Sequence, residues 1–313
     1  MLNLADLLQK SNGDLCVYQD LVAEADEPLS DRLTIVIPDM HLLEKKETDD
    51  FWDNNPDHEQ RFLRFLNFLV ILRNSEGPDL EIIQIGDLYD LWQARGNTNL
   101  ISAAYPDILG QLDLLSPIFV LGNHDFDLVK WYAGQTFGRK WRYFSAIQGN
   151  PRVIYEHGYQ ADFFNNQDSW SGTLGRGITE IIGMGEYLYP DVDVLLGSAW
   201  DSVSRTFTMY NGGLTPNTNP EGFSYHEYLN YYIDLMEKYN RGDTSDKHDP
   251  ANLSLAVVGH THTARLAKKF RNDRAYFLLD CGSWVNGGHE IGVIAGKQMA
   301  VCQWQGLLEV QSH

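Results

Sequence analysis

Cysteine is scarce in this sequence of 313 residues, which holds only Cys16, Cys281 and Cys302. The three thiols are widely separated, odd in number and without a C-x-x-C pair. They indicate free thiols in a reducing compartment and exclude a disulfide framework. Apolar runs long enough to span a bilayer are also missing, and the N-terminus lacks the basic start and apolar run of a signal peptide. A cytoplasmic protein is therefore expected.

Basic residues are few as well, with 24 lysines and arginines against 43 acidic residues and a net charge of -19. That much negative charge repels polyanions, so no nucleic-acid partner is expected. A metal site can still attract a phosphate locally, because bound divalent cations dominate the nearby field. The hydrophobic content of 43% is enough for a sizeable core in one large domain or two small ones.

A recurring pattern in the chain is a short apolar run that ends in polar residues. Such strands are expected at residues 33–37, 80–85, 117–121, 152–155 and 255–258. They end beside Asp39, Asp87, Asn123, His157 and His260, respectively. Ligands bind at the carboxyl ends of strands in open α/β sheets, so these five polar ends are expected on one rim.

The remaining segments predict the other elements of a single domain over residues 1–313. Residues 1–30 predict a short helix and a polar connector, and the apolar spacing at 60–73 predicts a longer helix. From residue 276 onward the pattern is typical of an antiparallel meander. Residues 162–251, rich in glycine and aromatic side chains, are interpreted as a helical lid inserted into the domain.

The polar strand ends supply the chemistry of phosphoryl transfer to water. Two divalent ions about 3.5–4 Å apart lower the pKa of a bridging water and stabilise the attacking and leaving oxygens. Such a pair of ions needs mixed imidazole and carboxylate ligands, with one carboxylate able to bridge.

In order and wording, the strand-end motifs resemble the calcineurin-like metallophosphoesterase superfamily. The family's signature is D-x-H, G-D-x-x-D, G-N-H-D/E, a lone H and G-H-x-H. Its counterparts here are Asp39-Met40-His41, Gly86-Asp87-Leu88-Tyr89-Asp90, Gly122-Asn123-His124-Asp125, His157 and Gly259-His260-Thr261-His262. The resemblance implies an α/β fold, a four-layer α/β/β/α sandwich of two mixed sheets with metals at the rim.

The resemblance also implies a role for each motif residue. One divalent metal ion (Mn, Fe or Zn) would be held by Asp39, His41, Asp87 and His262, and a second by Asp87, Asn123, His157 and His260. Asp87 would bridge the two ions. His124 would contact the phosphate or protonate the leaving oxygen, with Asp90 orienting it. Arg265 is close enough in sequence to reach a substrate phosphate.

The expected function is hydrolysis of a phosphomonoester, phosphodiester or pyrophosphate bond by a metal-bridging water or hydroxide. The expected substrate is a phosphorylated small molecule or a lipid-like phosphoester. The second and third motifs look most like the branch containing UDP-2,3-diacylglucosamine pyrophosphatase, although that enzyme usually has arginine in place of His124 and a shorter lid. A non-catalytic scaffold and a nucleotidase or nucleic-acid phosphodiesterase are the alternatives. The complete ligand set argues against the first and the acidic charge against the second.

Overall fold

The computed structural model of the chain describes residues 2–46, 48–52, 55–91, 93–94, 96–125, 128, 140–159, 161, 225–243 and 250–306. The chain divides into two units, one made of residues 1–158 and 233–313 and the other of residues 159–232. Most of the lid predicted at residues 162–251 lies outside the described residues. In the part that the structure describes, no helix is both long and apolar enough to cross a membrane.

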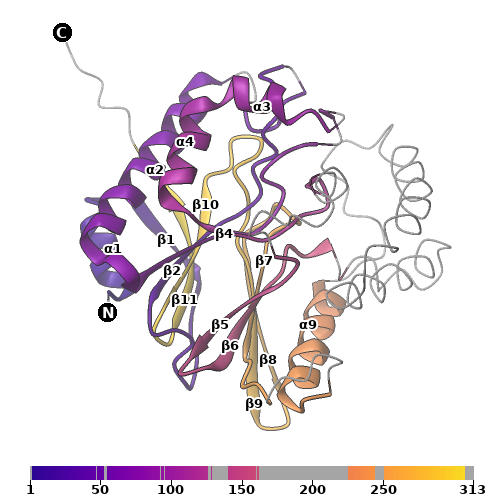
Figure 1. Cartoon of the computed structure of the whole chain (residues 1–313). Coiled ribbons are helices and arrows are strands. Elements are labelled where there is room, and N and C mark those ends of the chain that lie inside the picture. The colour runs from indigo at the N-terminus through magenta and orange to yellow at the C-terminus, as the bar shows by residue number, and fades with distance from the viewer. Residues whose placement is uncertain are drawn as a thin grey trace, which may run out of the picture. The chain divides into compact units, whose positions relative to one another are not determined.

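The first sheet is mixed and contains both the first and the last of the described strands (Figure 1). In spatial order its strands are β1 (Leu15–Glu24), β11 (Gln298–Trp304), β10 (Glu290–Ala295), β2 (Leu33–Ile37), β3 (Leu80–Gln84) and β4 (Ile118–Phe119). The neighbours β2, β3 and β4 run parallel, whereas β1, β11, β10 and β2 pair antiparallel. The parallel half carries three of the predicted polar strand ends.

The second sheet is also mixed. In spatial order its strands are β5 (Tyr143–Ile147), β6 (Asn150–Tyr155), β7 (Leu255–Val258), β9 (Arg274–Asp280) and β8 (Arg265–Arg271). The central strands β6, β7 and β9 are parallel, and the edge strands β5 and β8 pair antiparallel with their neighbours. The other two predicted strand ends follow β6 and β7.

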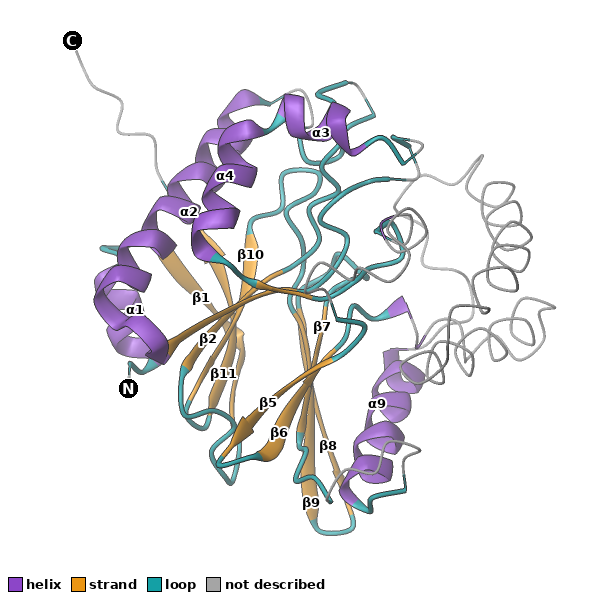
Figure 2. Cartoon of the chain, in the orientation of Figure 1, coloured by secondary structure: helices purple, strands orange, loops and turns teal. Residues whose placement is uncertain are grey.

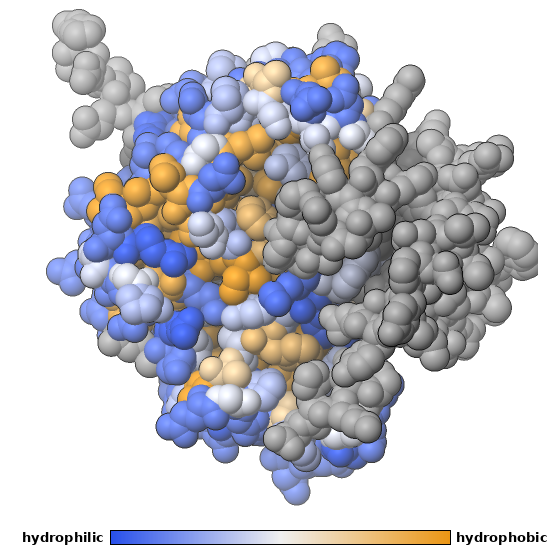
Figure 3. Space-filling model, viewed as in Figure 1, coloured by the Kyte–Doolittle hydropathy of each residue, from blue (hydrophilic) through white to orange (hydrophobic). Residues whose placement is uncertain are grey.

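Helices lie outside the sheets (Figure 2). They are α1 (Leu4–Lys10), α2 (Pro56–Glu76), α3 (Thr98–Ala104), α4 (Pro106–Leu115) and α9 (Tyr225–Asn240), with a 3₁₀ turn at Gly77–Asp79. The longest, α2, begins at Pro56 behind an Asn55 cap and ends at Gly77, whose φ of 59° suits glycine. Figure 3 shows hydrophobic and hydrophilic residues mixed over the described face of the molecule. Ile71 of α2 and Leu114 of α4 are exposed.

Alternation along the buried strands builds two apolar cores. Ile35 and Ile37 on β2 face the helices and pack in one cluster with Phe62 and Phe65 of α2. Val36, on the opposite face of β2, packs in a second cluster with Val257 of β7 and other side chains of the second sheet. The second half of α9, which belongs to the first unit, contacts the second sheet through ion pairs of Arg271 with acidic residues of the helix. The predicted fold of two mixed sheets with flanking helices is confirmed.

Three expectations about local structure were wrong. Residues 15–24, predicted as a polar connector, form β1 and pair with β11. The predicted meander from residue 276 is split, because β9 belongs to the second sheet and β10 and β11 to the first. The strand predicted at residues 117–121 is reduced to Ile118–Phe119. In each case the pairing of strands distant in sequence decided the outcome, which a local pattern does not encode.

Candidate metal centre

The loops that follow the parallel strands are connected to one another by hydrogen bonds. The carbonyl of Asp87 accepts from the N–H groups of Met40 and His41, at 3.0 and 2.9 Å. The two carboxylate oxygens of Asp39 accept from the N–H of His260, at 3.1 and 3.0 Å. The predicted ligands from both sheets therefore meet at the same rim.

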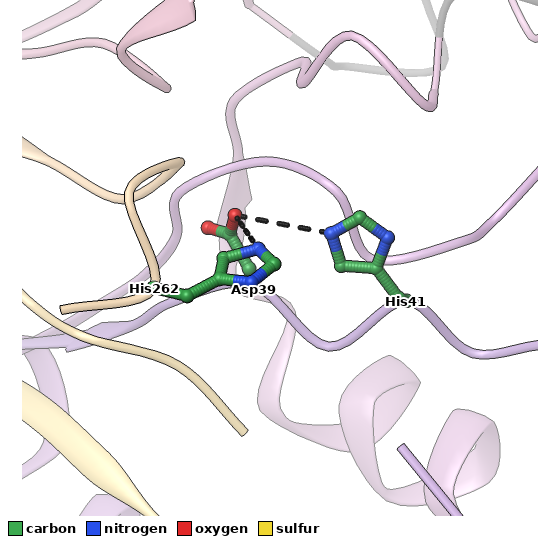
Figure 4. Close-up of side chains that lie close together, drawn as sticks. All are labelled: Asp39, His41 and His262. Atoms are coloured by element: carbon green, nitrogen blue, oxygen red, sulfur yellow. Dashed lines mark ion pairs between the residues drawn. The ribbon is translucent and has the colours of Figure 1, made fainter. Parts of the chain in front are cut away.

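Asp39, His41 and His262 form the first group of side chains that could hold a cation (Figure 4). The Oδ2 of Asp39 lies 3.1 Å from Nε2 of His262 and 4.0 Å from Nε2 of His41. Both ring nitrogens of His41 are buried without a hydrogen-bond partner among the described residues. Burial, together with the neighbouring His124, lowers the pKa of His41 to about 3. A neutral imidazole with unused nitrogens suits a metal ligand.

Asp87, His157 and His260 form the second group. The Nδ1 of His157 lies 3.1 Å from the carbonyl of Ile85, so a proton on that nitrogen leaves Nε2 to face the site. Two oxygens surround Nε2, the Oδ2 of Asp87 and the Oδ1 of Asn123, each at 3.1 Å. Two acceptors beside one nitrogen require a positive charge between them, either a proton or a metal ion.

The pKa of His157 shows how strongly this environment favours positive charge. Burial by itself would lower the pKa, but the carboxylates of Asp87 and Asp39 outweigh it and raise the value to about 10. The pKa of Asp87 lies well below its ordinary value although burial opposes that shift, since His157, His124 and His41 all stabilise the carboxylate. The donor set therefore fits divalent cations.

Asp87 connects the two groups. Its Oδ2 lies 3.5 Å from Nε2 of His41 on one side and 3.1 Å from Nε2 of His157 on the other. Its Oδ1 accepts from the backbone N–H of His124 at 2.8 Å. One carboxylate thus faces both groups and is held by the loop after β4.

Several of these residues have backbone conformations in the left-handed region. Their φ angles are 50° at His41, 47° at Asp87, 67° at His260 and 54° at His262. Such values are uncommon for residues other than glycine, and they persist only where the surroundings hold the chain. Backbone strain is therefore concentrated at the candidate ligands.

Three motif glycines leave the space that the ligands occupy. A Cβ on Gly122 would lie 2.0 Å from Oδ1 of Asp87, and one on Gly259 would lie 2.2 Å from Oδ1 of Asp39. A Cβ on Gly86 would come within 2.6 Å of Nδ1 of His157, at a φ of 107°. The sequence analysis gave these glycines no role of their own. Their position directly before a ligand in each motif was the available signal.

His124 lies beside the first group and bonds to Asp90. Its Nδ1 is 3.1 Å from Oδ1 of Asp90, and the other carboxylate oxygen accepts from the side chain of Gln93 at 2.6 Å. Burial would lower the pKa of His124, but the charges of Asp87 and Asp90 raise it. Gln93 was missed by the sequence analysis, because nothing in the motif points to a residue three positions after Asp90.

Asp125 connects two of the motif loops, and Arg265 lies at the start of a strand in the second sheet. The buried carboxylate of Asp125 accepts from the N–H groups of Tyr89 at 3.1 Å and Gly122 at 3.3 Å, which joins the second and third motif loops. Arg265 begins β8, opposite Asp280 in the strand register. Its predicted contact with a substrate phosphate stays a prediction.

A family model described as calcineurin-like phosphoesterase matches residues 33–264. The match includes both groups of candidate ligands and His124. The chain belongs to this family of metal-dependent phosphoesterases. No curated protein sequence matches it.

Chains of solved structures also match, 55 of them significantly. One is the crystal structure of a 5'-nucleotidase precursor from Thermus thermophilus, with 12% sequence identity and a TM-score of 0.36. The match covers 87% of this chain and 54% of that one, so the chain spans about half the length of that protein.

Proposed function

We propose that the chain hydrolyses phosphoester or pyrophosphate bonds with two divalent metal ions bound at the two side-chain groups. Asp39, His41, Asp87 and His262 hold one ion, and Asp87, Asn123, His157 and His260 hold the other. The observation that carries the proposal is the position of Asp87 Oδ2, within 3.5 Å of His41 Nε2 and 3.1 Å of His157 Nε2. A carboxylate between two imidazoles is suited to bridging two cations.

When bound, two such ions supply a nucleophilic water at neutral pH and positive charge for the transition state. The side chains of the protein then set the geometry of the reaction. The carboxylate of Asp90 holds the Nδ1 proton of His124, so its Nε2 is the nitrogen that contacts the phosphate or protonates the leaving oxygen. The raised pKa of His124 favours the protonated ring that such an acid needs. Arg265 supplies a further cation for the phosphate.

Metal analysis of two aspartate variants tests the bridge. Asp87→Ala is expected to lose both ions and all turnover, whereas Asp39→Ala keeps at least part of the second site. Asp113→Ala, an exposed aspartate on α4, is the matched control and keeps two equivalents of metal. Retention of two equivalents by Asp87→Ala would show that Asp87 does not bridge.

For the substrate we propose a phosphorylated small molecule, with a lipid-linked pyrophosphate as the narrower candidate. The continuation of the second motif as Asp90-Leu91 favours this branch over relatives with Asp-Arg-Gly at that place. Assays with UDP-2,3-diacylglucosamine and with an aryl phosphate, each with added Mn²⁺, distinguish a lipid-linked pyrophosphate substrate from a small phosphorylated substrate. Turnover of the aryl phosphate alone rejects the lipid substrate, and turnover of neither supports a non-catalytic scaffold.

A further inference from the structure

The turn that carries two candidate ligands, His260 and His262, is strained. The N–H of Thr261 donates to the carbonyl of Gly259 at 2.8 Å, which closes a three-residue turn around His260. Turns of this kind with a positive φ at the centre are rare. With His262 also left-handed, the backbone needs an external support to keep both imidazoles in place.

Asp280 supplies such a support from the second sheet. It is the last residue of β9, completely buried, and its Oδ2 accepts from the hydroxyl of Thr261 at 2.6 Å. The position of Asp280 is itself fixed, because it pairs with Val258 of β7 and the next N–H, that of Cys281, donates to the carbonyl of Val258 at 2.9 Å. The turn is thus connected through one side-chain hydrogen bond to the neighbouring strand.

The hydroxyl of Thr261 also orders the chain after His262. The N–H of Thr263 lies 3.3 Å from this hydroxyl, so the oxygen can accept there while it donates to Asp280. The hydroxyl of Thr261 therefore connects the residue before His262 with the N–H of the residue after it. The side chain of Thr261 points to the sheet, whereas the histidines on either side of it belong to the two metal groups.

We infer that Thr261 and Asp280 are positioning residues that set the separation of the two histidines and, through it, the spacing of the two metal ions. The inference rests on the proposed function, in which His260 serves one ion and His262 the other. Partners that orient the ligands of a metal contribute about 10–100-fold to metal affinity or activity. A defect here is expected to weaken both ions together, unlike the loss of one ligand.

The test compares Thr261→Val, which keeps the shape and removes the hydroxyl, with Thr261→Ser, which keeps the hydroxyl. Titration with Mn²⁺ is expected to show affinity weakened about 10–100-fold at both sites in Thr261→Val. Thr261→Ser stays close to the wild-type affinity, as does the control Asp113→Ala, whose side chain is exposed on α4. At saturating Mn²⁺ the kcat of Thr261→Val returns towards the wild-type value.

Unfolding temperatures measured in chelator separate positioning from folding. Thr261→Val is expected to unfold at a lower temperature than wild type without metal, because it leaves the buried carboxylate of Asp280 without the hydroxyl. The inference requires that this variant is still folded in chelator at the temperature of the metal titration. If Thr261→Val does not fold, Asp280→Asn provides the second variant, because its amide oxygen still accepts from the hydroxyl and is expected to preserve binding of both ions. Loss of both ions from a folded Asp280→Asn protein would contradict the inference.

Two results would overturn the inference, and a third separates it from the proposed function. Unchanged affinity in Thr261→Val, or equal losses in the valine and serine variants, shows that the hydrogen bond does not position the histidines. His262→Ala is measured alongside. If His262→Ala loses metal while Thr261→Val does not, only the positioning role fails. If His262→Ala keeps both ions at full affinity, the ligand assignment itself fails.

Discussion

Burial and charge act in opposite directions on the imidazole of His124. Desolvation favours the neutral ring, but Asp87 and the hydrogen-bonded Asp90 favour the protonated one and raise the pKa. The side chain lies beside His41, with ring centroids 4.4 Å apart, so a proton on His124 is presented at the edge of the first metal group.

Replacement of this imidazole tests its part in the reaction. His124→Ala is expected to keep both metal ions and lose about 10²–10⁴-fold in rate, because a positioned proton donor contributes that much. The loss is smaller for an aryl phosphate than for an alkyl phosphate, since a good leaving group needs no protonation. Equal losses for the two substrates in steady-state kinetics would argue for electrostatic stabilisation instead of acid catalysis.

The raised pKa of His157 predicts that metal binding releases a proton. In protein stripped by chelation the pKa is about 10, so His157 is protonated at pH 7 and a cation must displace that proton. Binding at the second site is expected to release about one proton at pH 7, measured by calorimetry in buffers of different ionisation enthalpy. The release disappears above about pH 10. A release from His157→Ala equal to that of the wild type would contradict this origin.

The same shift affects the stability of the stripped protein. The folded-state pKa of His157 lies above its ordinary value of 6.5. The ion pairs of the protonated ring therefore stabilise the fold fully below pH 6.5, and this contribution is lost as the pH rises through about 10. His41 behaves in the opposite way. Its pKa is lowered to about 3, so its neutral ring stabilises the fold above pH 6.5, and this contribution is lost as the pH falls through about 3.

Among the secondary-structure elements, β5, β6 and α9 are joined by one arginine. Arg142, just before β5, forms an ion pair with Glu156, the residue between β6 and His157. It also donates to the hydroxyl of Tyr239 near the end of α9. The side chain of Glu156 is only 1% exposed, so its charge depends on Arg142 for compensation.

Arg142→Met is expected to destabilise the protein by about 3 kcal/mol, because it leaves a buried carboxylate without its partner. Arg142→Met/Glu156→Met recovers most of that loss, since the double replacement removes both charges. Urea denaturation at pH 7 measures both variants. The control is Glu27→Gln in the ion pair with Arg152; at 64% exposure of Glu27, breaking this pair costs less than about 1 kcal/mol. A double variant as unstable as Arg142→Met would contradict this explanation.

The elements also show which parts of the structure the sequence predicts. The fully buried strands β2, β3 and β7 are short apolar runs, and their pattern was sufficient to place them. The strand β1 is mixed in composition and only partly buried along its length, and it pairs with β11. The strand β5 (Tyr143–Ile147) was missed, although the turn at Gln148 and Gly149 before β6 is a local signal of a hairpin.

At the site, the motifs were sufficient to name the side chains that the structure brings together at one rim, because each follows a strand end. Gln93, and the contact of Thr261 with Asp280, could not be predicted in the same way. They depend on how loops and strands come together in space. For the same reason the strain at His260 and His262 was not foreseen, because a motif gives the order of residues and not their φ angles.

At the scale of the whole molecule, the proposed ions join the two sheets. In the proposed assignment, each ion would take ligands from loops after the first sheet and from the loops after β6 or β7 in the second. Chelation is expected to lower the unfolding temperature, and adding back Mn²⁺ raises it in a concentration-dependent way. The corresponding gain in the free energy of unfolding is about 2.7 kcal/mol for one ion at 100 times its Kd. Calorimetry with and without chelator measures the shift, and Asp113→Ala shows the same shift as wild type. A melting temperature that does not respond to chelation would show that no metal bound to the folded state stabilises it.

The pairing of β1 with β11 has a consequence for folding during synthesis on the ribosome. Leu15 pairs with Trp304, so β1 finds its neighbour only after roughly 280 further residues have been synthesised. At about 5–20 residues per second, that wait is on the order of 15–60 s. Over this interval β1 presents unpaired N–H and C=O groups of the kind that recruit other chains. The nascent chain is therefore expected to depend on holding chaperones until translation reaches the last strand of its first sheet.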